Sequence, residues 1–158
     1  MALMHQQLYE HKTYESIGAA KYSSELLALI TRSHTTVGQQ NIEAVLVPPD
    51  EEVFLTMDQA LPFGLLLNEL VTNSIKHAFT DQDAGEIRIS MSQDSDMNIV
   101  VVEDNGKGVE EGIELGKTTS LGFQLIPGLV EQLDGEIALI RDNGTRYEIR
   151  FRKQETEE

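Results

Sequence analysis

The sequence predicts an α+β fold, a two-layer α/β sandwich in which a mixed, mostly antiparallel sheet carries helices on one face. Helical and strand-like patterns follow one another in the order helix, helix, strands, helix, hairpin, glycine-rich loop, helix, hairpin. Both hairpins consist of neighbouring strands joined by short polar turns, which makes most of the sheet antiparallel. The chain has 158 residues, 40% of them hydrophobic, which suits one domain with one core.

The chain begins with two predicted helices, over residues 1–9 and 19–33, because apolar residues recur there at helical spacing. A β-rich segment over residues 41–47 runs into two prolines, which cannot continue a sheet ladder, so a strand should end there. Residues 53–55 add a short second strand. The residues that set the helical spacing are Leu3, Met4, Leu8, Tyr22, Leu26, Leu27 and Ile30.

A long helix is expected from Asp58, a residue suited to N-capping, to about Phe79. Pro62 falls early enough in this helix that its missing N–H should cost little. Alternating residues over 86–91 and 98–103 predict the first hairpin. The residues of its first strand that should point inward are Ile87, Ile89 and Met91.

The last third of the chain begins with a predicted loop over residues 104–120, which contains four glycines and no sustained period. Helical spacing resumes over 121–133, and a strand pair over 135–141 and 145–152 surrounds an Asp-Asn-Gly turn. The charged residues 154–158 are expected to form a disordered tail. The apolar positions of this last helix are Leu125, Leu129 and Leu133.

Charge and composition exclude several classes of function. The formal net charge of -15 argues against a nucleic-acid partner, because such surfaces need clustered Lys and Arg. It does not exclude a nucleotide, whose phosphates can be met locally by Mg2+ and backbone N–H groups. The absence of cysteine removes disulfides and thiolate catalysis. No apolar run approaches the ~20 residues needed to span a bilayer, so we expect no membrane contact by this chain and a cytoplasmic location.

A stripe of four polar residues shares one face of the long predicted helix, at spacings i, i+4, i+7 and i+8. The Asn amide oxygen suits Mg2+, the Lys ammonium suits a phosphate oxygen, and the Glu could position a metal-bound water or accept a proton. An exposed helix face with ordinary charge pairing has the same spacing, so the stripe alone does not distinguish a binding site from such a face. The four residues are Glu69, Asn73, Lys76 and His77.

A second motif carries an apolar strand directly into a glycine-rich turn. Asp104, at the end of this strand, can accept a hydrogen bond from an exocyclic amine such as adenine N6. Gly106 and Gly108 let the backbone approach a flat ring without Cβ clashes. A plain Asp-Asn-Gly hairpin turn has the same residues, so this motif alone also leaves both interpretations open.

Together the two motifs resemble the Bergerat-type ATP-binding fold, which is shared by histidine kinases, gyrase, Hsp90-like chaperones and MutL-like ATPases. Residues 68–79 resemble its N box, residues 104–108 its first glycine box and residues 120–123 its second. The pair Gly144-Thr145 resembles the terminal Gly-Thr that lies beside the adenine-reading Asp.

Within that superfamily the chain is similar to one histidine-kinase subgroup. Residues 61–70 carry part of this resemblance, and residues 1–9 are similar to the end of the subgroup's second dimerisation helix. Ser120 departs from the pattern, because the second glycine box usually begins with another Gly.

The resemblance implies an ATP and Mg2+ site with a role for each matched residue. Asn73 would bind Mg2+, Lys76 and His77 would lie near the phosphates, and Glu69 takes the position of a catalytic or metal-supporting acid. Residues 109–120 would form the ATP lid. The other implied nucleotide-binding residues are Asp104 with its support Thr145, the loop glycines Gly106 and Gly108, and Leu121 and Gly122 at the helix whose N-terminus faces phosphate.

The phosphoacceptor of the subgroup lies in a sequence similar to His-Arg-Xaa-Lys-Asn-Asn, which this chain lacks. His5 matches a position late in the second dimerisation helix and is interpreted as structural. We therefore expect residues 1–17 to be a remnant of that helix with its linker, and residues 18–153 to be the ATP-binding catalytic domain. The implied partners are ATP or ADP, the histidine-bearing dimerisation helices of the parent kinase and, through the parent, a response regulator.

Two other functions stay open at this point. A stand-alone serine kinase resembling bacterial anti-sigma factors shares the Glu-x-x-x-Asn and Lys-His spacings, although residues 1–9 and 135–151 argue against it. A non-catalytic nucleotide-binding module is indicated by Ser120 alone.

Overall fold

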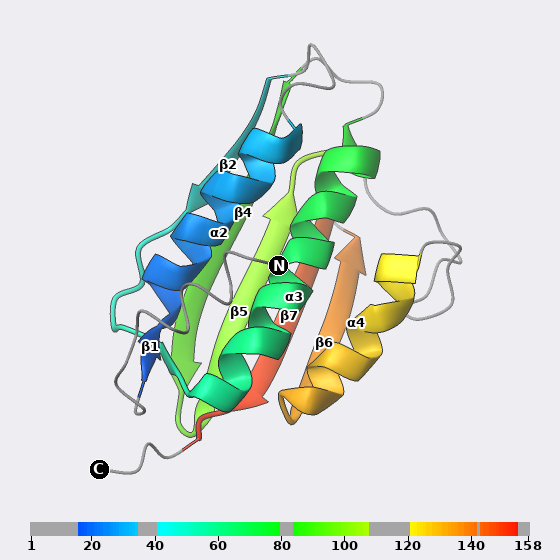
Figure 1. The fold of residues 1–158 in the computed structure, drawn as a ribbon. Helices are drawn as coiled ribbons and strands as arrows, with labels where there is room; N and C mark the ends of the chain where they lie inside the picture. Colours follow the sequence, from blue (N-terminus) through cyan, green and yellow to red (C-terminus); the bar gives the residue numbers. More distant parts are fainter. Residues whose placement is uncertain (1–15, 35–40, 80–83, 108–120, 142, 155–158) are drawn as a thin grey trace.

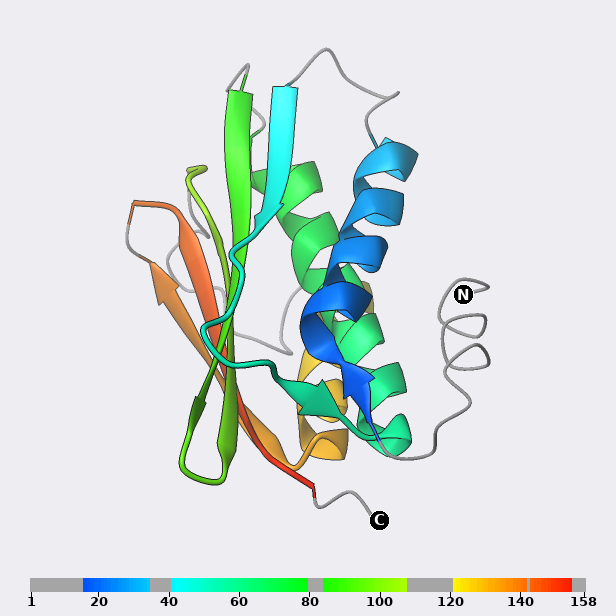
Figure 2. The same ribbon diagram turned by 90° about the vertical axis from the view of Figure 1, so that its left-hand side faces the viewer.

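The computed structural model describes residues 16–34, 41–79, 84–107, 121–141 and 143–154. Over these residues, three α-helices cover one face of a five-stranded sheet, so that the fold is a two-layer sandwich (Figures 1 and 2). This arrangement confirms the predicted fold class. The helix expected over residues 1–9, the predicted lid and most of the predicted tail lie outside the described residues. No helix in the described part of the chain is long and apolar enough to cross a membrane.

The main sheet has the strand order β2-β4-β5-β7-β6. Strand β2 pairs with β4 in parallel, and the other three pairings are antiparallel, as expected for a mixed, mostly antiparallel sheet. A separate two-stranded sheet joins β1 (Ile17–Gly18) to β3 (Phe54–Leu55). The strands of the main sheet are β2 (Asn41–Leu46), β4 (Ala84–Asp94), β5 (Met97–Asp104), β6 (Gly135–Arg141) and β7 (Thr145–Arg152).

The helices are α2 (Ala19–His34), α3 (Met57–Asn73) and α4 (Leu121–Gln132), and α3 continues into a short π-helical turn, η1 (Ser74–Ala78). The predicted N-cap of α3 was wrong. Thr56 caps the helix, because its hydroxyl accepts from the Gln59 backbone N–H while Gln59 Oε1 accepts from the Thr56 N–H. This capping box satisfies two backbone donors at once, whereas Asp58 lies within the first turn.

The earlier start of α3 also changes the place of Pro62. Because the helix begins at Met57, Pro62 is its sixth residue and lies inside the helix rather than at its first turn. Its ring nitrogen cannot donate to the carbonyl of Asp58, so the proline removes one intrahelical bond. Pro62 is itself buried, so its packing helps to offset this loss.

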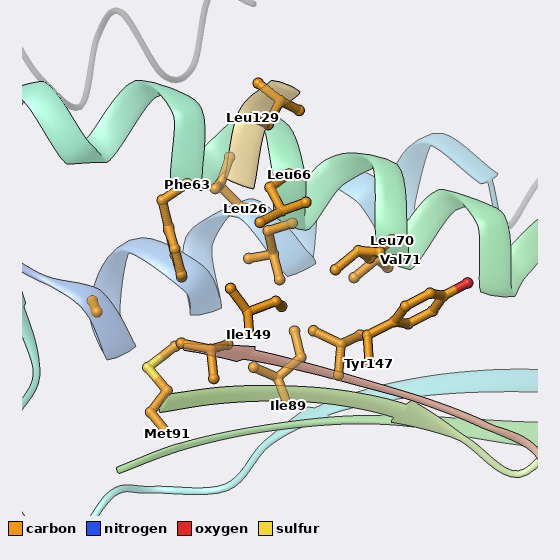
Figure 3. Close-up of a cluster of buried hydrophobic side chains, with 14 of the residues drawn as sticks. Leu26, Phe63, Leu66, Leu70, Val71, Ile89, Met91, Leu129, Tyr147 and Ile149 are labelled. Atoms are coloured by element: carbon orange, nitrogen blue, oxygen red, sulfur yellow. The ribbon is translucent and has the colours of Figure 1, made fainter. Parts of the chain in front are cut away.

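The core lies between the helices and the inner face of the sheet. Figure 3 shows Phe63, Leu66 and Leu70 of α3 directed toward Ile89 of β4 and Ile149 of β7. All five side chains are at most 2% exposed. The predicted core residues of α2 and the inward residues of β4 are buried as expected: Tyr22, Leu26, Leu27, Ile30, Ile87, Ile89 and Met91.

One predicted periodic position of α4 lies outside this core. Leu125 is 49% exposed, whereas its neighbour Ile126 is buried together with Leu129 and Leu133. Successive residues of a helix turn by about 100°, so the face that meets α3 and the sheet passes through Ile126 and leaves Leu125 on the outside.

Candidate functional site

Several of the predicted site residues lie at one end of the sandwich, where α3 and β5 end and where β7 and α4 begin. Asp104 at the end of β5 is directly opposite Thr145 at the start of β7. Ser74, immediately after α3, donates a hydrogen bond to Asp104. Glu69 of α3 lies against Gly122 in the first turn of α4. Four elements that are distant in sequence therefore supply one site.

Asp104 is held in a fixed orientation by three hydrogen bonds. Its Oδ1 accepts from the backbone N–H groups of Gly106, at 3.0 Å, and Thr145, at 3.3 Å. Its Oδ2 accepts from the hydroxyl of Ser74 at 2.7 Å. The side chain is buried, with the residue only 8% exposed. A carboxylate has about four acceptor positions, so one on Oδ2 remains for a further donor.

Ser74 is the site residue that the sequence analysis missed. Its hydroxyl is buried and makes a short bond to a charged acceptor, which is the stronger class of protein hydrogen bond. In the sequence, only its position next to Asn73 could have drawn attention to Ser74. That position does not predict the contact with Asp104, because a regular helix through this region does not indicate which side chain faces β5.

The end of α3 departs from the regular helix that the prediction extended to Phe79. The α-helix ends at Asn73, and Ser74–Ala78 form a π-helical turn, in which hydrogen bonds span five residues. The spacing that put four polar residues on one face therefore ends at Asn73. Glu69 and Asn73 are half-buried, whereas Lys76 and His77 stand exposed to solvent. Such π turns occur frequently at functional sites.

Asn73 carries a buried amide nitrogen that has no hydrogen-bond partner among the described residues. A buried donor without a partner costs free energy, so it suits an external acceptor such as a phosphate oxygen or an ordered water. The amide oxygen of the same side chain is a ligand type that Mg2+ accepts. Over the described residues no group of three or more His, Asp or Glu could hold a metal. The residues present thus fit a Mg2+ ion that takes one protein oxygen and completes its shell with phosphate oxygens and water.

Gly106 packs against the π turn rather than leaving an open space. A Cβ at this position would overlap the carbonyl oxygen of Ala78 and lie 2.6 Å from the Ala78 Cβ. The next residue, Lys107, donates its backbone N–H to that carbonyl at 2.9 Å. The turn that follows Asp104 is thus held against the end of η1. Glycine is required here by the close approach of two backbone segments.

Tyr147 is a further polar group near the site that the sequence did not single out. It lies two residues after Thr145 on β7, so its side chain is on the same face of the sheet. Figure 3 shows its hydroxyl pointing along α3, past Leu70 and Val71. Burial, and secondarily the negative charge of Asp104, raise the pKa of Tyr147 above its ordinary value, against an opposing effect of Arg141. The phenol is therefore uncharged at neutral pH.

Two of the predicted nucleotide-binding residues lie at the start of α4. Leu121 is the first residue of α4, and Gly122 follows it in the first turn. Gly108 and the lid predicted over residues 109–120 lie outside the described residues. Their assigned roles stay predictions.

Comparison with known protein families gives one match over most of the chain. Residues 58–155 match the family model described as histidine kinase-, DNA gyrase B-, and HSP90-like ATPase. This range contains all the residues of the site described above.

Two curated relatives are histidine kinases. The chain is 36% identical over 100 residues to sensor histidine kinase PdtaS of Mycobacterium tuberculosis, which covers 61% of this chain and 20% of that protein. It is 32% identical over 92 residues to blue-light-activated histidine kinase 2 of Erythrobacter litoralis, which covers 58% of this chain and 27% of that protein. The chain thus spans about a quarter or less of the length of these relatives.

Among solved structures, the fold is similar to the histidine kinase domain of the Erythrobacter litoralis EL346 blue-light-activated histidine kinase. The TM-score is 0.79 at 24% identity, and the match covers 95% of this chain and 70% of that chain. The nucleotide-free catalytic domain of histidine kinase ThkA matches with a TM-score of 0.71 at 17% identity, over 89% of this chain and 96% of that chain. Both likenesses show the same fold.

Proposed function

Because the chain belongs to the family of histidine kinase-, DNA gyrase B- and HSP90-like ATPases, we propose that it is the ATP-binding catalytic domain of a sensor histidine kinase. In this proposal it binds Mg-ATP and donates the γ-phosphoryl group to a histidine on the dimerisation helices of its parent kinase. The similarity to a sensor histidine kinase and to a blue-light-activated histidine kinase supports the choice of this function within the family.

The proposal that this site binds a nucleotide rests on one observation, the burial and hydrogen bonding of the Asp104 carboxylate. A buried carboxylate is costly unless it is hydrogen-bonded, and three donors hold this one. The remaining acceptor position on Oδ2 suits the exocyclic amine of adenine, which is a donor, and does not suit the carbonyl oxygen that guanine has at that position. The site should therefore favour ATP over GTP.

The other residues keep the roles that the family resemblance implies for them. Asn73 would hold Mg2+ through its amide oxygen, and Glu69, one helical turn before it, would act on the reacting phosphate or on the incoming imidazole. Lys76 and His77 would meet the phosphates from the solvent side, where their exposure lets them move. Bound Mg2+ would neutralise charge on the β- and γ-phosphates.

The proposal is tested by calorimetric titration of the chain with ATP, ADP and GTP, with and without Mg2+. ATP should bind more tightly than GTP and more tightly with Mg2+ than without. The variant Asp104→Ala should lose adenine-nucleotide binding while a circular dichroism spectrum shows an intact fold. Equal ATP affinity in that variant would reject the assignment of Asp104.

Phosphotransfer is tested separately, by adding the dimerisation helices of a related kinase and ATP labelled on the γ-phosphate. A histidine kinase should label the added helices with phosphate that acid removes and base does not, because a phosphoramidate bond is acid-labile. An acid-stable label would instead support the serine-kinase hypothesis. Tight ATP binding without any transfer would support the non-catalytic module.

A further inference from the structure

The carboxylate of Glu69 occupies the space that a side chain at position 122 would need. A Cβ built on Gly122 would overlap Oε2 of Glu69 and would lie 2.8 Å from its Cδ. Gly144 is the glycine with a positive φ among the described residues, so the requirement at Gly122 is for space and not for an unusual backbone conformation. An alanine at this position would have to displace the Glu69 carboxylate.

The Glu69 carboxylate is the part of this contact that can move. Its neighbours on α3, Leu66 and Leu70, are at most 1% exposed and anchor the helix in the core. No hydrogen bond or ion pair holds the Glu69 carboxylate within the described part of the chain. Because close-packed helices do not separate easily, a group added at position 122 would rotate the Glu69 side chain instead.

We propose that Gly122 is a positioning residue for Glu69. Because Gly122 has no Cβ, the Glu69 carboxylate can lie beside it, at the end of the site where the phosphates would bind. This inference rests on the proposed function for the role of Glu69, but the contact itself does not. Glu69 precedes Asn73 by four residues on the same face of α3, so a displaced carboxylate would no longer lie beside the proposed Mg2+ ligand. A substitution at Gly122 would therefore act on the phosphates and not on adenine.

The same helix offers a matched control. Gly128 also lies in α4, but a Cβ built on it meets nothing within 4 Å. The variant Gly128→Ala makes the same chemical change as Gly122→Ala without entering occupied space. Any effect of alanine on the helix itself is present in both variants, so the difference between them isolates the contact with Glu69.

The experiment is a double-mutant cycle on the full chain, with Gly122→Ala, Glu69→Asp, the two combined, and Gly128→Ala as control. Calorimetry measures the affinities for Mg-ATP and for ADP. We expect Gly122→Ala to weaken Mg-ATP on the order of tenfold, the size typical of losing a group that orients a ligand-binding residue. The affinity for ADP, which lacks the γ-phosphate, should change much less, and Gly128→Ala should bind both nucleotides like the unmodified chain.

The shorter carboxylate tests the mechanism. In the Glu69→Asp background, Gly122→Ala should cause little further loss, because the group that it would displace is already withdrawn. An equal loss in both backgrounds would overturn the proposal, and so would an unchanged ratio of ATP to ADP affinity in Gly122→Ala.

Failure of the proposed function would be recognised separately. If the unmodified chain bound no nucleotide, the thermal melting temperatures of the same variants would still report on the contact. Non-additive melting temperatures for Gly122→Ala and Glu69→Asp would support the contact, whereas additive values would overturn it.

Discussion

Replacing Ser74 with alanine should destabilise the protein measurably, because it removes a buried hydrogen bond to a carboxylate. The bond from Ser74 Oγ to Asp104 Oδ2 is 2.7 Å long, and the two residues are 4% and 8% exposed. A hydrogen bond to a charged group typically contributes about 1.5–3 kcal/mol. Alanine recovers up to about 0.5 kcal/mol as the better helix former, which leaves a net loss of roughly 1–2.5 kcal/mol.

This loss predicts a shift that thermal melting can resolve. For a protein of this size, 1 kcal/mol corresponds to roughly 2–4 °C, so the melting temperature of Ser74→Ala should fall by about 2–10 °C. Urea unfolding followed by circular dichroism would give the free-energy change directly, with an unchanged dependence on urea concentration if the fold is retained.

A second buried serine provides the control. Ser23 of α2 is 0% exposed, and its hydroxyl has no partner among the described residues. Replacing it with alanine removes a buried polar group that makes no bond, so Ser23→Ala should leave stability unchanged or raise it. If Ser74→Ala cost no more than Ser23→Ala, the bond to Asp104 would contribute nothing and the reasoning would be refuted.

Three further predictions follow from other contacts. Gly106→Ala should lower the melting temperature, since its Cβ would overlap the Ala78 carbonyl and overpacking typically costs about 1–3 kcal/mol; an unchanged melt would mean that the turn relaxes freely. Asn73→Ala should abolish the strengthening of ATP binding by Mg2+ in calorimetry, and a retained metal response would reassign this residue. Burial raises the pKa of Tyr22 from 10.0 to about 12, so the unfolded chain releases the proton first and stability falls as pH rises through that window. Tyr22→Phe should flatten part of this fall in alkaline unfolding curves, and an identical slope would contradict the cause.

The sequence was a good guide where local physics decides the outcome. The alternation that predicted the hairpins is imposed by the strand backbone itself, and the closing strand pair has the predicted bounds, Gly135–Arg141 and Thr145–Arg152. Asp104 could be singled out for the same reason, because a carboxylate at the end of an apolar strand and before a glycine is visible without any tertiary contact.

Prediction from local sequence failed at both ends of α3. At one end two residues could cap the helix, and at the other the helical period changed from that of an α-helix to that of a π turn. Both Thr56 and Asp58 are suited to N-capping, and Thr56 caps α3 because Gln59 completes the reciprocal pair. At the other end of α3, a period of 3.6 residues predicts a helix to Phe79. The bond of Ser74 to Asp104 and the packing of Gly106 on Ala78 accompany a π turn instead.

The sequence by itself determined the layers of this protein and most of the residues that meet at its site, because apolar periodicity and residue chemistry are properties of short segments. Only the tertiary structure decided that Ser74 completes the shell of Asp104 and that Glu69 takes the space beside Gly122. Ser74 and Asp104 are 30 positions apart in the sequence, and Glu69 and Gly122 are 53 positions apart. The geometry of these contacts depends on how α3 packs against β5 and α4, and no pattern within one segment contains that information.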